Sequence, residues 1–196
     1  MKLFTWGMGL EFFIMPPRYD KLLVLDLDET LIYSVEKPLE RTPDFSVFNY
    51  FVYKRPGVDY FLSTCTSWFD TAVWTSAGSD YAHQIIQHIF PEPKKLQFIF
   101  TEERCNVRFD YESSSYSYVK RLKKLKKRGY PLDKVLIVDD TPETFIDNYS
   151  NAILVQKYKG EQEDEELFLL LKYLEMIGSV ENVRKIEKRE WWHFVF

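Results

Sequence analysis

Short, mostly apolar runs alternate along this chain with stretches in which apolar residues recur every three or four positions. The runs cover residues 22–25, 71–74, 97–101, 135–138 and 152–155. Apolar runs of this length are typical of strands buried on both faces of a parallel sheet. Helical spacing occurs over residues 58–67, 81–90 and 167–176. Strands that alternate with helices predict an α/β fold with helices on both faces of a central parallel sheet.

Three segments between these elements have a different character. The aromatic and β-branched residues of 45–53 favour extended structure, which we expect to form a flap beside the site. Residues 102–115 are charged and hydroxylated and predict an exposed loop. After them, Tyr118, Leu122 and Leu125 recur at helical spacing before Gly129, so we expect a helix over 116–128.

The composition fits one domain with reduced cysteines. The chain has 196 residues, 45% of them hydrophobic, and can bury a core of ordinary size. Its net charge of −4 argues against a protein that binds nucleic acid through overall positive potential, so no sequence-specific nucleic-acid partner is expected. Cys65 and Cys105 lack Cys-x-x-Cys spacing, which indicates neither disulfides nor zinc and favours a cytoplasmic or other reducing compartment.

We divide the chain into an apolar N-terminal arm (1–19), a main domain (20–178) and a helical and aromatic C-terminal extension (179–196). The arm is too short before Pro16 and Pro17 to span a bilayer, and it lacks a typical signal-peptide cleavage pattern. It either packs on the domain or docks peripherally on a membrane or a protein partner. The aromatic residues 191–196 either pack back onto the domain or mark a truncation of a longer chain.

Two aspartates directly follow the first apolar run. Asp26 and Asp28 lie one residue apart at the carboxyl end of the predicted strand, where ligands bind in open α/β sheets. Because two carboxylates this close repel one another, they need either a nearby cation or separated pKa values, which would make one a nucleophile and the other an acid. The competing interpretations are solvated turn residues or a helix cap formed by Asp28 or Thr30.

Two further predicted strands also end in polar residues. Thr75 and Ser76 follow one strand, and Asp139 and Asp140 follow another. Since the carboxyl ends of parallel strands share one edge, four carboxylates would meet there and need a cation. An all-oxygen set without a His or Cys cluster suits Mg²⁺ far better than Zn²⁺. Such an ion would offset the repulsion between a carboxylate nucleophile and an anionic phosphate.

The residues around Asp26 resemble a known family. Residues 26–30 are similar to the Asp-x-Asp-x-Thr signature of haloacid dehalogenase (HAD) superfamily phosphatases, in the DLDET form of the small C-terminal-domain phosphatase, Dullard-like and nuclear-LIM-interactor-interacting-factor-like group. Further blocks similar to that group's follow in its order, at 54–58, 74–77 with 81–82, 104–105, 118–120 and 138–142. The resemblance spans residues 20–175 and implies a Rossmann-like three-layer HAD-like phosphatase domain with small flap or insert elements and no large cap domain.

Carried over to this sequence, the resemblance implies a role for each matching side chain. Asp26 is implied as the nucleophile that forms an aspartyl-phosphate. Asp28 would protonate the leaving oxygen and later activate water, which requires a pKa above that of its neighbour. Thr75, with Ser76 beside it, and Lys120 would bind the phosphate.

The resemblance also implies the ligands of Mg²⁺. The ion would bind the carboxylate of Asp26, the backbone carbonyl of Asp28 and the carboxylate of Asp140, with Asp139 in support. Some relatives have Asn where this chain has Asp140, so the division of labour between Asp139 and Asp140 stays open.

Two basic features carry open interpretations. Lys120 begins the basic run 120–128, whose other members we expect to form a solvated helix face, with docking to a membrane or a protein as the alternative. Arg104 aligns with a family block near the site and either steers substrate or forms a loop salt bridge.

One departure from the family bears on the substrate. Residues 34–38 place charged Glu36 where relatives that act on the RNA polymerase II tail are expected to have an aromatic residue. We therefore expect another phosphorylated protein substrate, with phosphoserine or phosphothreonine slightly ahead of phosphotyrosine. An inactive scaffold is disfavoured because the catalytic residues are present, and a small-metabolite phosphatase is disfavoured because the inserts 31–53 and 102–117 are too small for its cap.

Overall fold

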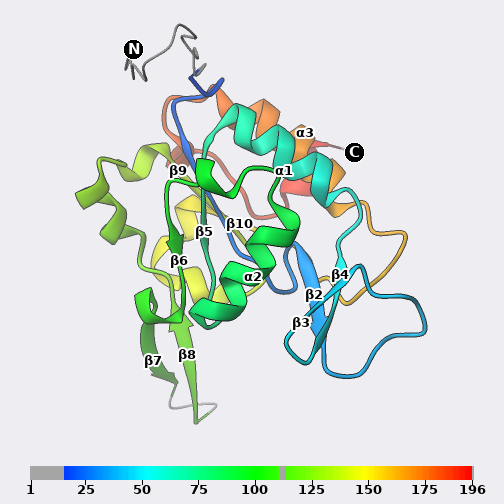
Figure 1. The fold of residues 1–196 in the computed structure, drawn as a ribbon. Coiled ribbons are helices and arrows are strands. Elements are labelled where there is room, and N and C mark those ends of the chain that lie inside the picture. Colours follow the sequence, from blue (N-terminus) through cyan, green and yellow to red (C-terminus); the bar gives the residue numbers. More distant parts are fainter. Residues whose placement is uncertain (1–15, 111–113, 196) are drawn as a thin grey trace, which may run out of the picture.

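The computed structural model describes residues 16–110 and 114–195, and a five-stranded parallel sheet lies at its centre (Figure 1). The strand order is β10-β9-β1-β5-β6. The strands are β1 (Leu22–Leu25), β5 (Asp70–Trp74), β6 (Ile99–Phe100), β9 (Val135–Asp139) and β10 (Ala152–Leu154). β1 occupies the middle of the sheet, and all four of its residues are buried, as the uninterrupted apolar run predicts.

Helical segments cover both faces of this sheet. On one face, Leu23 and Leu25 join the core formed with α1 (Val58–Trp68), α2 (Ser79–Ile89) and α3 (Glu166–Gly178). On the other face, Leu22 and Val24 pack with residues of the 3₁₀ segments η3 (Leu122–Arg128) and η5 (Pro142–Asn151). The predicted three-layer α/β fold is therefore confirmed. Shorter 3₁₀ turns are η1 (Pro93–Lys95), η2 (Glu102–Arg104), η4 (Leu132–Lys134), η6 (Val183–Lys185) and η7 (Trp191–Phe194).

The predicted flap is a small antiparallel sheet with the strand order β2-β4-β3. Its strands are β2 (Ile32–Val35), β3 (Phe45–Val47) and β4 (Tyr50–Lys54). The extended structure expected over 45–53 is confirmed, and it turns at Phe48, whose φ of 54° lies in the left-handed region. Figure 1 shows this sheet beside the carboxyl-terminal edge of the parallel sheet.

The helix expected over 116–128 and the loop expected over 102–115 are wrong in part. Residues on both sides of position 112 form an antiparallel hairpin of β7 (Asn106–Asp110) and β8 (Ser115–Val119). In β8 the aromatic residues Tyr116 and Tyr118 alternate with serines, which is the two-residue period of a strand. The helical part begins only at Leu122 and is 3₁₀, a geometry that puts Leu122 and Leu125 on one buried face.

The aromatic C-terminal residues pack back onto the domain. Trp191 is fully buried, its indole Nε1 donates to the carbonyl of Leu154 at 2.8 Å, and its ring lies 5.7 Å from that of Tyr173 on α3. Most of the N-terminal arm, residues 1–15, lies outside the described residues. Within the described ranges, every helix is too short or too polar to cross a membrane.

Candidate active site

The loop after β1 presents Asp26 and Asp28 at the carboxyl edge of the sheet. The amide of Asp26 donates to the carbonyl of Val138 on β9 at 3.1 Å, so the backbone at Asp26 continues the hydrogen bonding of the sheet. The chain then turns sharply, because the amide of Leu31 donates to the carbonyl of Leu27 at 2.8 Å. Glu29 takes a left-handed conformation with φ 58°, and this tight loop fixes both aspartates.

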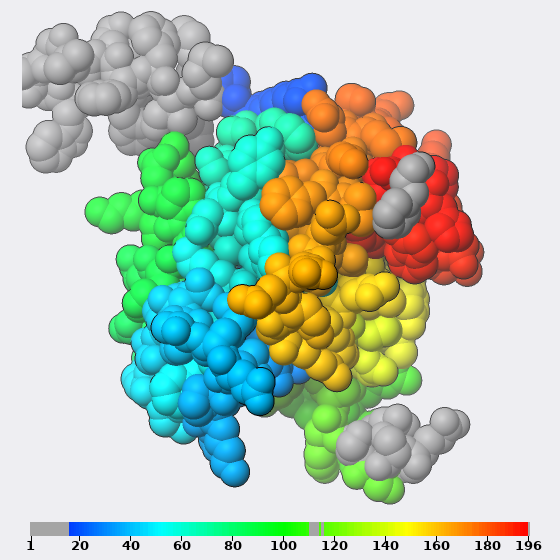
Figure 2. Space-filling model, turned by 90° about the vertical axis from the view of Figure 1, so that its right-hand side faces the viewer, coloured from blue at the N-terminus to red at the C-terminus, as the bar shows by residue number. Residues whose placement is uncertain are grey.

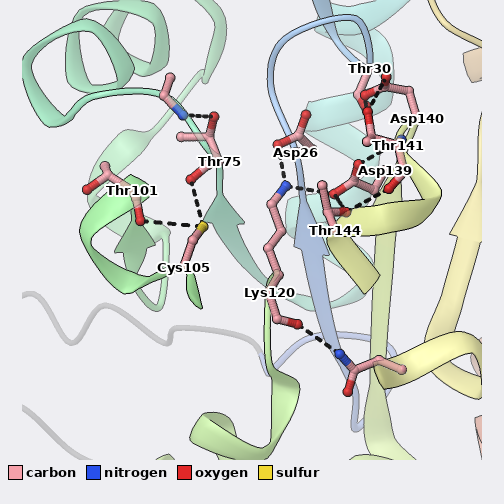
Figure 3. Close-up of polar contacts among 12 residues, drawn as sticks. Asp26, Thr30, Thr75, Thr101, Cys105, Lys120, Asp139, Asp140, Thr141 and Thr144 are labelled. Atoms are coloured by element: carbon pink, nitrogen blue, oxygen red, sulfur yellow. Dashed lines mark hydrogen bonds and ion pairs between the residues drawn. The ribbon is translucent and has the colours of Figure 1, made fainter. Parts of the chain in front are cut away.

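A buried lysine ties Asp26 to the end of β9. Lys120 lies just after β8 and is fully buried, and its Nζ donates to Asp26 Oδ1 at 2.5 Å and to Asp139 Oδ2 at 2.7 Å (Figure 3). Burial lowers the pKa of Lys120, but the charges of Asp139 and Asp26 outweigh it and hold the pKa above its usual range. Lys120 therefore stays charged between two carboxylates from different strands.

Hydroxyl and amide groups hold the two aspartates at the end of β9. Asp139 accepts the Thr144 hydroxyl at 2.7 Å and the Thr141 amide at 3.0 Å. Asp140 accepts the Thr30 hydroxyl at 3.1 Å and the Thr141 hydroxyl at 2.9 Å. These bonds, visible in Figure 3, leave both carboxylates rigid and directed toward Asp26.

Asp26, Asp139 and Asp140 form the group best suited to hold a metal ion. One carboxylate oxygen from each lies within 4.8 Å of the others, and all three residues are buried. Burial raises the pKa of Asp26 well above its usual range, Lys120 opposes that shift, and Asp139 and Asp140 add to it. A divalent cation among these oxygens would favour the ionised form of Asp26, and the all-oxygen set fits Mg²⁺.

Asp28 has a separate environment on the flap side of the site. The hydroxyl of Tyr81 on α2 donates to Asp28 Oδ1 at 2.6 Å, and Ser34 Oγ on β2 lies 2.6 Å from the same hydroxyl. Burial raises the pKa of Asp28, and the hydrogen bond from Tyr81 opposes the shift. Its surroundings thus differ from those of Asp26, which is paired directly with a lysine.

The hydroxyl residues after β5 form the opposite wall. Thr75 is buried, and its Oγ1 accepts the amide of Ala77 at 3.0 Å, which shapes the turn. A cavity of about 590 Å³ opens between these walls. Its lining includes Asp26, Asp28, Thr75, Ser76, Asp139 and Asp140, together with Tyr116, Ser117 and Tyr118 of the hairpin.

Arg104, a predicted site residue, neither lines this cavity nor contacts the aspartates that do. It is exposed, its guanidinium lies 5.1 Å from the ring centre of Phe100, and its carbonyl accepts the ammonium of Lys124 at 2.6 Å. The lining residues of the cavity do not include it. Its suggested role in steering substrate stays a prediction.

Several residues that shape the site had no role in the sequence interpretation. Lys157 reaches Asp140 Oδ2 at 3.3 Å and Glu29 Oε2 at 3.0 Å, so it adds a second cation beside the aspartates. Tyr81 and Thr144 supply the hydrogen bonds to Asp28 and Asp139. Tyr81 lies in a block that resembles the family, and this resemblance could have identified it as a site residue. No sequence pattern indicated Lys157 or Thr144.

Comparisons with known proteins agree with this geometry. Residues 21–184 match the family model described as "NLI interacting factor-like phosphatase". Nuclear envelope morphology protein 1 of Schizosaccharomyces pombe is 30% identical over 175 residues, covering 85% of this chain and 35% of that protein. A probable C-terminal domain small phosphatase of Dictyostelium discoideum is 32% identical, covering 85% and 53%. CTD nuclear envelope phosphatase 1 of Xenopus laevis is 29% identical, covering 86% and 72%. The chain thus spans about a third to a half of the first two relatives.

Solved structures share the fold at low sequence identity. The fission yeast RNA polymerase II CTD phosphatase Fcp1, bound to beryllium fluoride, superposes with a TM-score of 0.53 at 17% identity, covering 89% of this chain and 50% of that one. An uncharacterized protein from Listeria monocytogenes superposes with a TM-score of 0.55 at 14% identity, covering 85% and 99%. These matches agree with the parallel-sheet architecture described above.

Proposed function

Because this chain belongs to the NLI interacting factor-like phosphatase family, we propose that it is a Mg²⁺-dependent phosphoprotein phosphatase that acts through an aspartyl-phosphate on Asp26. The observation that carries the proposal is the fully buried Lys120, which donates to Asp26 and Asp139, two residues that line an open cavity. A charged lysine here lowers the repulsion between a carboxylate nucleophile and a phosphate dianion.

In this mechanism Asp26 attacks phosphorus with the oxygen that Lys120 does not hold. Lys120 donates to Oδ1, and Oδ2 accepts no hydrogen bond from the residues that the structure describes. Thr75 and Ser76 line the cavity and would bind the phosphate oxygens. The carboxylates of Asp26 and Asp140 and the backbone carbonyl of Asp28 would hold Mg²⁺, with Asp139 in support. When bound, the ion supplies positive charge that stabilises the transferring phosphoryl group.

Asp28 is the proposed general acid and base. It lines the same cavity on the flap side, and burial raises its pKa against the opposing effects of Tyr81 and the charge of Lys120, which favours a protonated carboxyl. It would donate this proton to the departing serine or threonine oxygen. The resulting carboxylate would then take a proton from the water that attacks the aspartyl-phosphate.

The substrate class follows from the small inserts beside the cavity. The flap and the hairpin flank the carboxyl edge of the sheet without enclosing it, which suits a phosphorylated side chain on a protein surface. Relatives whose names include CTD phosphatase support a protein substrate. We propose phosphoserine or phosphothreonine, and phosphotyrosine is the alternative within the same mechanism.

Location and docking are also part of the proposal. The names of two relatives refer to the nuclear envelope, and we propose that this chain works in a reducing compartment, associated peripherally with a membrane or a protein. The basic run supports docking because Lys123, Lys126 and Lys127 are all exposed. The apolar arm is the other candidate, and residues 1–15 of it lie outside the described structure.

The decisive experiment measures phosphate release from para-nitrophenyl phosphate and from three peptides that differ only in carrying phosphoserine, phosphothreonine or phosphotyrosine. We expect Mg²⁺-dependent hydrolysis by the wild-type chain and at least a 1000-fold loss of kcat, a drop of about 4 kcal/mol in transition-state stabilisation, in Asp26→Asn. Asp28→Asn should slow release of the alcohol and hydrolysis of the intermediate. Full activity after exhaustive chelation, or substantial activity in Asp26→Asn, would overturn the mechanism.

A further inference from the structure

One face of the β7–β8 hairpin consists of apolar side chains. The strand register pairs Val107 with Tyr118 and Phe109 with Tyr116. Because directly opposed residues, and residues two apart on one strand, point to the same side, these four side chains share one face, called here the hairpin aromatic face. Val119 belongs to the opposite face and is buried.

The hairpin aromatic face is open to solvent although it is apolar. Tyr116 is 75% exposed, Val107 63% and Tyr118 39%, whereas Val119 on the opposite face is only 2% exposed. The rings of Phe109 and Tyr116 lie 4.9 Å apart and brace each other. Figure 2 shows the hairpin, in green, protruding at the lower edge of the molecule. A cluster of large apolar side chains with this exposure indicates a binding surface.

This face is continuous with the candidate active site. Tyr116 and Tyr118 line the same cavity as Asp26 and Thr75. The hydroxyl of Tyr118 donates to Glu102 Oε2 at 3.3 Å, which anchors its ring at the cavity rim. Lys120 follows β8 directly, two residues after Tyr118, and donates to Asp26. One short stretch of chain therefore connects the apolar face to the proposed reacting groups.

We propose that the hairpin aromatic face binds apolar side chains of the phosphorylated substrate segment itself, next to the residue that enters the cavity. The proposal rests on the proposed function and adds a substrate class, phosphorylated segments with a large apolar residue close to the phosphorylated position. We assign the substrate as the molecule that binds this face, because Tyr116 and Tyr118 of the face also line the cavity that would receive the phosphate of the substrate.

The length of the hairpin sets the positions that this face contacts. An extended chain advances about 3.3 Å per residue, and the five paired positions of β7 and β8 span roughly 13 Å. A substrate with its phosphate near Lys120 would therefore place on this face side chains that lie about two to five residues from the phosphorylated one.

The test measures binding separately from hydrolysis. Each peptide in the series carries a fluorescent label, one phosphoserine and one leucine, and the leucine lies two to five residues before or after the phosphoserine. The reference peptide has serine at all of these positions. Dissociation constants are measured with the Asp26→Asn variant. Burying most of a leucine side chain predicts about tenfold tighter binding for at least one position. In chains with Asp26 intact the same peptide should show a lower KM with little change in kcat.

Two substitutions and one control connect the effect to this face. Val107→Thr and Tyr116→Thr each introduce a β-branched residue suited to a strand and remove apolar surface. Each should therefore reduce the tenfold preference to about fivefold or less. Val107→Thr should leave hydrolysis of para-nitrophenyl phosphate unchanged, because Val107 does not line the cavity. Tyr60→Ser, at an exposed position of α1, is the matched control and should keep the full preference.

The possible outcomes separate this proposal from the proposed function. Absence of any leucine preference, or a preference that both hairpin variants retain, overturns the substrate-binding role whatever the activity. A preference in the dissociation constants without any hydrolysis by the wild-type chain upholds the binding face and overturns the phosphatase mechanism. Dimerisation of the wild-type chain that Tyr116→Thr abolishes, measured by sedimentation, assigns the face to a second copy and also overturns the proposal.

Discussion

At the scale of single residues, the hydrogen bonds of Tyr81 decide which oxygen of Asp28 is available for the proton transfer that we propose. The hydroxyl of Tyr81 has one proton, and it donates this proton to Asp28 Oδ1. Ser34 must therefore donate to the oxygen of Tyr81 across their 2.6 Å contact. Burial and the charge of Asp28 raise the pKa of Tyr81, so Tyr81 stays protonated. Asp28 Oδ2 is then the oxygen available to carry the catalytic proton.

Tyr81→Phe tests this assignment because the ring remains and only the donor is removed. We expect kcat for a phosphoserine peptide to fall about tenfold to 100-fold, since its alkoxide leaving group needs a well-placed acid. Para-nitrophenyl phosphate releases a weakly basic phenolate and should lose much less. The measurement is kcat for both substrates, with Tyr50→Phe as the control for loss of a neighbouring hydroxyl. Equal losses on both substrates would contradict an orienting role.

The residues proposed to react were easier to identify in the sequence than the residues that contact them. Asp26 and Asp139 could be found because Asp26 directly follows an apolar strand and Asp139 ends another, and parallel strands align their carboxyl ends. Lys120 required the resemblance, because by composition it belongs to a solvated basic run, yet it is fully buried. Lys157 and Thr144 act only through tertiary contacts, and no spacing along the chain indicates those contacts.

At the scale of elements, Arg55 joins three parts of the chain behind the site. Its Nε and Nη2 donate to the two carboxylate oxygens of Asp164 at 2.8 and 2.7 Å, and its Nη1 donates to the carbonyl of Thr30 at 3.1 Å. The end of β4 is thereby fixed to the loop after β1 and to the segment before α3. Since Thr30 also donates to Asp140, this clamp supports one of the proposed metal ligands.

Arg55→Lys should weaken this clamp because an ammonium cannot reproduce the two parallel hydrogen bonds of a guanidinium. Arg55 is 1% exposed, and we expect a loss of about 2–4 kcal/mol in the free energy of unfolding, less than the full cost of removing one partner of a buried pair. Urea denaturation measures it. Lys54→Gln removes a neighbouring, more exposed pair with Asp59 and should cost less than about 1 kcal/mol. Similar losses in the two variants would contradict the clamp.

The elements themselves were predictable to different degrees. The five central strands and the three α-helices follow patterns that burial imposes, because each must hide a continuous apolar face. The hairpin was missed because its apolar face is exposed, so Tyr118 could be counted with Leu122 and Leu125 as a helical stripe. Apolar residues in a strand usually face the core, and in this hairpin they face the solvent. Such exceptions are expected where a protein binds a ligand or a partner.

At the scale of the whole molecule, the C-terminal residues complete the core. Trp191 is fully buried against α3 and reaches the carbonyl of Leu154 at the end of β10, so residues beyond the family match contribute to stability. Trp191→Ala should lower the free energy of unfolding by about 3–5 kcal/mol, because it empties a large volume in a packed core. Activity per folded molecule should stay unchanged, since Trp191 does not line the cavity.

Thermal and urea unfolding would measure the effect of Trp191→Ala, with Phe194→Ala as the control. Phe194 belongs to the same segment but is 53% exposed, so its removal should cost much less. A Trp191→Ala protein as stable as the wild type would mean that the C-terminal segment lies on the surface without supporting the core.

The position of β1 between β5 and β9 has a consequence for the folding of the protein during its synthesis on the ribosome. One neighbour of β1 is synthesised soon after it, but the other arrives late, and the bonded residues Thr30 and Asp140 are 110 positions apart. Until β9 emerges, the nascent chain displays an unpaired edge on its most apolar strand, which invites pairing with other chains. The incomplete polypeptide also lacks half of its acidic centre. We therefore expect the growing chain to need chaperones most in the interval before Asp139 and Asp140 emerge.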